Sequence, residues 1–87
     1  MPKKTRKMVH VVWEDSAGAA RWDDEKRATR NRTVMCETVG VLLRRDRKHT
    51  VIASSVCEET ETVSDVMSIP AGCVKSVRHI GTLSKRR

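Results

Sequence analysis

Basic side chains dominate the residues of this chain that could bind a ligand. The segment 44–48 reads RRDRK and places four bases within five residues, where a polar turn between two strands is expected. Such clusters attract phosphate groups, and copies repeated around an oligomeric ring would form a phosphate-binding rim. Charged turns more commonly protect a sheet edge from aggregation, so the sequence is compatible with either phosphate binding or edge protection. The candidate ligand-binding residues here are Arg44, Arg45, Arg47 and Lys48, with Arg44 and Lys48 as the best pair.

The two ends of the chain carry the remaining candidate bases. These are Lys3, Lys4, Arg6, Lys7, Lys85, Arg86 and Arg87. Their number equals the whole formal net charge of +7, and the segment 8–84 is neutral, with eleven bases and eleven acids. Short flexible ends of this kind contact phosphates without reading a base sequence. We therefore expect any nucleic-acid affinity to come mostly from the ends and to show little sequence preference.

Other residues give weaker chemical signals. The acids Glu58, Glu59, Glu61 and Asp65 offer oxygen ligands, but their spacing matches no known metal-binding loop. A solvated turn, or a surface complementary to the basic turn of a neighbouring subunit, fits them better. The histidines and cysteines lack the two-to-five-residue spacing of structural zinc. Without a nucleophile elbow or a Gly-rich phosphate loop, the sequence predicts no enzyme, no metal and no cofactor.

Length and composition predict one small domain with a thin core. The 87 residues include no Phe or Tyr, so we expect Trp13 and Trp22 to anchor the core rather than to stack on bases. A core this small favours a homo-oligomer. Three cysteines without a CxxC pair indicate reduced thiols. No apolar run reaches the roughly 18–20 residues that cross a bilayer, so we expect a cytoplasmic protein with no membrane partner.

The hydrophobic pattern predicts a mainly β fold. Expected strands cover 8–14, 33–43, 50–56 and 63–69, and a tight turn after Pro70 leads into a last strand within 74–83. One or two helical turns are expected after Asp23 as the N-cap, and Gly40 suggests a bulge or bend. The order fits a small SH3-like or Sm-like five-stranded barrel, or an open meander, with one short helix. The expected organisation is a basic tail (1–7), one β-rich domain (8–83) and a second basic tail (84–87).

Three segments resemble a set of small uncharacterised bacteriophage proteins. They read VVWEDSAGAARW, CETVGVLLRRDRKHTVIASS and IPAGCVKSVRHI, and the resemblance spans Val9 to Ile80. A looser resemblance is to Sm-like barrels, whose two RNA-contacting turns correspond here to RDRKHT and IPAG. The uridine-pocket residues of that family do not carry over. The second resemblance therefore implies the fold and not RNA specificity.

Together these features predict a non-enzymatic accessory protein of phage type in the host cytoplasm. It would be an oligomeric β-barrel that binds an anionic partner, with nucleic acid as the first candidate. Two alternatives stay open. One is an oligomeric sponge that sequesters a nucleotide immune signal of host defence, and the other is a protein-interaction module that inhibits a host enzyme. Steep salt dependence of binding would favour nucleic acid over both.

Overall fold

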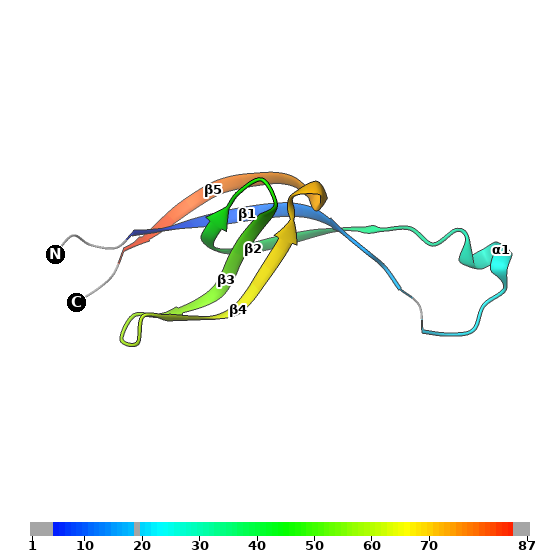
Figure 1. Cartoon of the computed structure of the whole chain (residues 1–87), viewed down its shortest axis with the longest axis horizontal. Helices are drawn as coiled ribbons and strands as arrows, with labels where there is room; N and C mark the ends of the chain where they lie inside the picture. The colour runs from blue at the N-terminus through cyan, green and yellow to red at the C-terminus, as the bar shows by residue number, and fades with distance from the viewer. Residues whose placement is uncertain (1–4, 19, 85–87) are drawn as a thin grey trace.

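Five antiparallel strands form one curved sheet in the computed structural model of the chain, which describes residues 5–18 and 20–84 (Figure 1). The elements are β1 (Thr5–Asp15), α1 (Glu25–Ala28), β2 (Val34–Arg45), β3 (His49–Cys57), β4 (Thr62–Pro70), the 3₁₀ turn η1 (Ala71–Cys73) and β5 (Val74–Ser84). The strand order is β4-β3-β2-β1-β5. The predicted mainly β fold is confirmed, while no β4–β5 pairing closes the sheet among the described residues. The helix in this part of the chain is too short to span a membrane.

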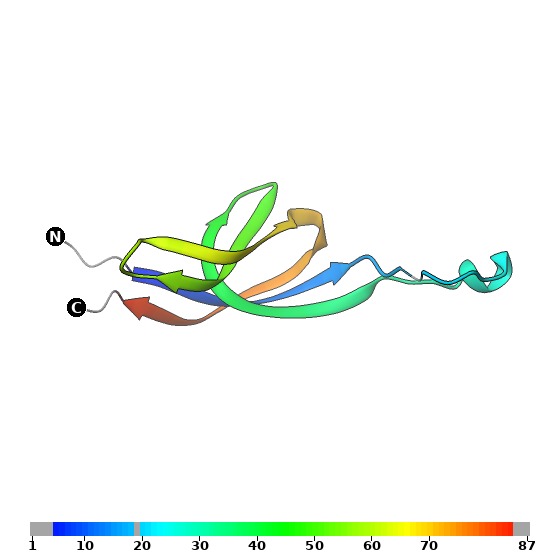
Figure 2. The ribbon, with the colours of Figure 1, turned by 90° about the horizontal axis from the view of Figure 1, so that it is seen from below.

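β2 pairs with different neighbours along its two halves. Residues 34–41 pair with β1, and residues 41–45 pair with β3 after a register shift between Leu42 and Arg44. At Gly40 a Cβ atom would meet the carbonyl oxygen of Ala53 at 2.8 Å, so only a residue without a side chain permits this close approach. The strand bends here, as predicted, and Figure 2 shows the β3–β4 hairpin lying above the layer of β1, β2 and β5.

The core lies between these two layers. Its buried residues are Val9, Val11, Ile52 and Ile69, contributed by β1, β3 and β4. In β1 the buried positions alternate with partly exposed ones, as expected for a strand with one face on the core. Trp13 packs against this cluster, as predicted, and its Nε1 donates to Oγ1 of Thr38 at 2.9 Å.

The prediction that Trp22 anchors the core is wrong. Its relative exposure is 101%. It lies beyond the end of β1 in the segment that leads to α1, where no described residue from Ala20 to Met35 is buried. The ring therefore has no apolar layer to pack against, whatever its intrinsic preference for burial.

β1 begins at Thr5, three residues before the predicted start of the domain. Arg6 and Lys7 therefore lie in a strand, opposite Leu83 and Thr82 of β5, rather than in a tail. The other bases predicted at the chain ends lie outside the described residues, and they are Lys3, Lys4, Lys85, Arg86 and Arg87. The start of β1 and the end of β5 lie side by side, at the end of the molecule opposite α1 (Figure 1).

An arm formed by residues 14–35 projects from the sheet. The pairing of β5 with β1 stops at Trp13 and Val74, so the last two residues of β1 pair only with β2. The arm ends in α1, at one extreme of a molecule that measures 61 Å along its longest axis (Figures 1 and 2). Since its described residues beyond Ala17 are all exposed, the arm has no core of its own.

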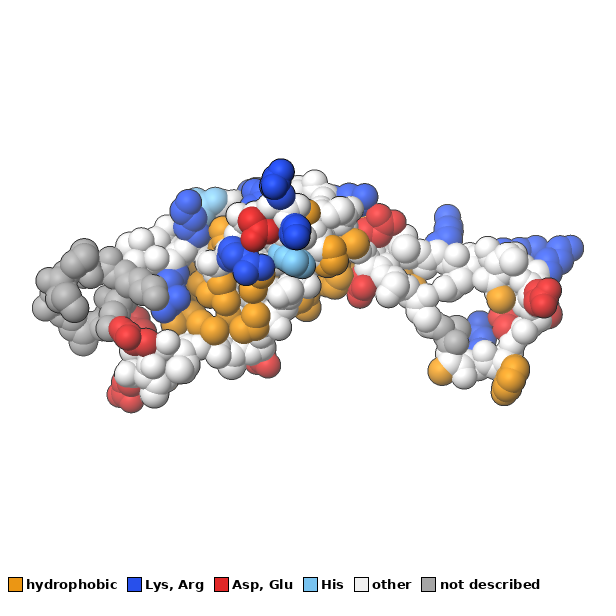
Figure 3. Space-filling view, in the orientation of Figure 1, with side chains coloured by type: hydrophobic (Ala, Val, Ile, Leu, Met, Phe, Trp, Pro, Cys, Tyr) orange, Lys and Arg blue, Asp and Glu red, His pale blue; other side chains and the backbone are white. Residues whose placement is uncertain are grey.

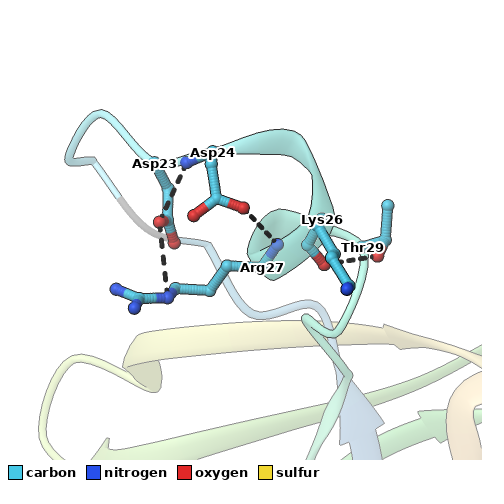
Figure 4. Close-up of polar contacts among 5 residues, drawn as sticks. All are labelled: Asp23, Asp24, Lys26, Arg27 and Thr29. Carbon is cyan, nitrogen blue, oxygen red and sulfur yellow. Dashed lines mark hydrogen bonds and ion pairs between the residues drawn. The ribbon is translucent and has the colours of Figure 1, made fainter.

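Local hydrogen bonds hold the single turn of α1 (Figure 4). Asp24 is the N-cap, and its Oδ1 accepts from the backbone N of Arg27 at 2.9 Å. The predicted N-cap, Asp23, is one residue too early: its Oδ1 accepts from the backbone N of Asp24 at 3.0 Å and lies 3.7 Å from Nε of Arg27. At the other end, Oγ1 of Thr29 donates to the carbonyl oxygen of Lys26 at 2.7 Å. The arm thus ends in a capped turn rather than a packed helix.

Candidate anion-binding site

Asp46 shapes the basic turn between β2 and β3. Its Oδ1 accepts from the backbone N of Lys48 at 2.9 Å and of His49 at 2.8 Å, and its own N donates to the carbonyl oxygen of His49 at 2.9 Å. An Asp side chain that bonds the following backbone in this way stabilises a tight turn. The two backbone N–H groups, with Arg44 adding to their effect, lower the pKa of Asp46. The acid inside the RRDRK segment therefore acts as the structural centre of the turn.

Arg44 and Lys48, the predicted pair of ligand contacts, lie on one side of this turn. With His49 they line a shallow depression of about 400 Å³. Nε of Arg44 is 2.9 Å from Oδ2 of Asp46, so much of its charge is already compensated within the turn. Lys48 makes no ion pair with any described residue, and its side chain is exposed. The pair is thus brought together, but with one free cation rather than two.

Arg45 lies on the other side of the turn, where β5 adds another base, and Arg47 lines the depressions on both sides. Together with Lys75 they line a depression of about 190 Å³. The acid Asp46, the buried Thr50 and the exposed Ser76 also line it. The two guanidinium groups and the Lys75 ammonium, which is paired with Glu14, are donors suited to the oxygens of a phosphate.

Lys75 is the residue of this site that sequence reasoning misses. It reaches the turn because the backbone N of Ala71 donates to the carbonyl oxygen of Lys48 at 2.8 Å, which holds η1 against the turn. Its Nζ also lies 3.1 Å from Oε1 of Glu14, at the base of the arm. The Thr33 hydroxyl and Lys75 together lower the pKa of Glu14. Lys75 therefore stands between the basic turn and the arm.

Segment 8–84 has no net charge, but its bases and acids gather in different parts of the fold. The β2–β3 turn has four bases and one acid, whereas the β3–β4 turn and the start of β4 carry four acids, which are Glu58, Glu59, Glu61 and Asp65. In Figure 3 most Lys and Arg side chains lie along the upper side of the molecule and its arm, and the β3–β4 turn at the lower left is acidic. The folded part thus presents a basic side of its own, which the charge count alone does not reveal.

Comparisons with protein-family models, with curated proteins and with solved structures find no match to this chain. The candidate site therefore rests on its own geometry: three cations and one acid, Asp46, around a shallow surface of a small curved sheet.

Proposed function

We propose that this protein is a non-enzymatic accessory protein of phage type that binds nucleic acid through its phosphate groups. The observation that carries the proposal is that Arg45, Arg47 and Lys75 line one depression, beside the turn at the opposite end of β3 from the acidic β3–β4 turn. The phage assignment is supported by the sequence resemblance of segment 9–80 alone. The bases of the chain ends would add to the same attraction.

Phosphate contact fits this site better than base reading does. The depression is shallow and its cations come from the end of β2, the turn after it and the start of β5, so no single helix or two-stranded ribbon carries them into a groove. Contacts of this kind neutralise phosphates and release counterions, and they fix position without discriminating sequence. The proposed binding is therefore strongly salt-dependent and tolerant of sequence.

Arg45 and Arg47 are expected to control the salt dependence of binding. In the full chain, Arg45→Ala with Arg47→Ala should reduce the magnitude of the slope of log K against log salt by about 1.8 for a duplex and about 1.4 for a single strand, because each lost phosphate contact removes about 0.9 or about 0.7. The measurement is fluorescence anisotropy of a labelled 20-nucleotide strand and of its duplex over a range of salt concentrations. Both substitutions lie at exposed positions and leave Asp46 in place to hold the turn.

Two matched variants separate charge from damage to the turn. Arg45→Lys with Arg47→Lys keeps both charges and should keep the wild-type slope. Asp46→Asn keeps an oxygen that accepts the two backbone N–H groups but removes the negative charge, so it should tighten binding. An unchanged slope in the double alanine variant would contradict this site. A full-length chain that binds no nucleic acid even at low salt would contradict the function and favour the nucleotide sponge or the protein-interaction module.

Self-association is part of the same proposal. Several large apolar side chains remain 39–51% exposed on the sheet, and they are Val39, Val66, Met67, Ile80 and Leu83. Their burial between copies would add to a core that has few buried side chains per chain. Sedimentation velocity at micromolar concentration should show a species heavier than the 9.9 kDa chain. A folded 9.9 kDa monomer would contradict the oligomer.

A further inference from the structure

The end of the arm is defined here as residues 20–33. Trp22 is the large apolar side chain in this segment. It is fully exposed, and the other apolar residues described in this segment are alanines. A tryptophan placed far from the core, with its indole open to solvent, gives nothing to the stability of the fold. Its position therefore points to a role in contact with another molecule.

Arginines surround the same end of the arm. Arg21 precedes Trp22 in the chain, and Arg21, Arg27, Arg30 and Asn31 line a depression of about 340 Å³. Arg27 is 3.7 Å from Asp23, which also lines the depression (Figure 4). Arg21 and Arg30 make no ion pair within the described part of the chain. The end of the arm thus combines one open aromatic ring with five bases and three acids, and Arg21 and Arg30 are bases outside the ion pair.

A protein partner, including a second copy of the chain, fits this surface poorly. Stable interfaces bury about 800 Å² on each side, and their centres are depleted in charged residues. The end of the arm has eight charged residues in fourteen positions, with a single large apolar side chain among them. A lone ring among cations is instead the arrangement by which proteins hold unpaired bases: the ring stacks on a base, and the cations follow the backbone.

We infer that the end of the arm is a binding site for single-stranded nucleic acid, in which Trp22 stacks on an unpaired base and Arg21 and Arg30 contact the adjacent phosphates. The inference rests on the proposed function and adds the class of ligand. The ring accepts any base, because every base offers a flat face for stacking. In a duplex the bases stack on each other, so their faces are closed to the ring. The arm therefore gives a preference for single strands that the basic turn by itself does not provide.

The two tryptophans of the chain allow a direct test. Trp13→Phe leaves Trp22 as the sole indole, and its emission should be quenched as a 12-nucleotide oligothymidine saturates the protein. In the otherwise unchanged full chain, Trp22→Ala should weaken binding of this strand by roughly 5- to 100-fold, while binding of a 12-base-pair duplex changes less than about twofold. Trp22→Phe, which keeps a smaller ring, should recover part of the loss. The Trp22→Ala and Trp22→Phe variants keep Trp13, so their affinities remain informative even if Trp13→Phe does not fold.

Each other outcome identifies what has failed. Equal weakening of strand and duplex by Trp22→Ala would overturn stacking, as would unchanged affinity for both, while the proposed function would survive. Quenching of Trp22 that depends on protein concentration without any oligonucleotide would overturn the inference in favour of a second copy. If no variant and not even the wild-type chain binds either ligand at low salt, the inference and the proposed function both fail.

Discussion

Replacing Ile52 with alanine is expected to lower the free energy of unfolding by about 2–5 kcal/mol. The side chain is 2% exposed and packs in a cluster with Val9, Val11 and Ile69, so truncation leaves a cavity bounded by strands of both layers. A domain of this length has a total stability of roughly 4–13 kcal/mol, at about 0.05–0.15 kcal/mol per residue. The loss would therefore remove a large part of what holds the sheet together.

Urea unfolding followed by circular dichroism measures this loss. The matched control is Val34→Ala, a truncation of an apolar side chain in β2 that is 46% exposed and is not among the residues proposed to pack between copies. It should cost about 0.5 kcal/mol, as for ordinary surface substitutions. Equal losses at both positions would mean that the core does not lie where the structure places it.

Replacing Gly40 with alanine is expected to destabilise the domain by about 1–3 kcal/mol, although it adds a single methyl group. The added Cβ would lie 2.8 Å from the carbonyl oxygen of Ala53, which is backbone and cannot rotate away. β2 and β3 would have to separate at the bend, which also moves Ile52 in the core. The expected destabilisation thus comes from a steric clash between β2 and β3 and not from a lost contact.

The control for this variant is Gly81→Ala. A Cβ atom at Gly81 would meet nothing within 4 Å, so its effect should stay within about 0.5 kcal/mol. Urea midpoints of the two variants give the comparison, and amide exchange at Ala53 reports whether β3 has moved. Identical midpoints for the two glycine variants would contradict a bend held by backbone contact at Gly40.

The strands could be predicted because each has a local pattern. Val9 and Val11 alternate with less buried residues in β1, and Pro70 ends β4 before the short turn of η1. The bend could be predicted as well, because a glycine inside an apolar strand commonly marks a bulge or a close approach of two backbones. The extension of β1 to Thr5 could not, because the polar residues before Met8 join the sheet through pairing with β5 rather than through any apolar pattern of their own.

The site was predictable only where its residues are neighbours in the chain. The four bases of segment 44–48 form a visible cluster, whereas Lys75 joins them through one backbone hydrogen bond between η1 and the turn. Composition also misled the interpretation of Trp22, because a ring in a chain with few aromatic residues is expected to be buried. No local signal in the sequence says that the segment around α1 extends away from the sheet, since that depends on where the β1–β5 pairing stops.

If the chain binds nucleic acid as proposed, the placement of the arm sets the length that a ligand needs to reach both extremes of the molecule. The strand ends next to the basic chain termini and the end of the arm lie at opposite extremes of a molecule 61 Å long (Figure 1). This distance equals the length of about 18 base pairs at 3.4 Å each, so a ligand that reached both extremes would need a duplex of nearly that length beside the single strand proposed for the arm. Shorter ligands reach only one extreme at a time. A nucleic acid that engaged both extremes of one chain would be covered over close to two helical turns, a large reach for a protein of 87 residues.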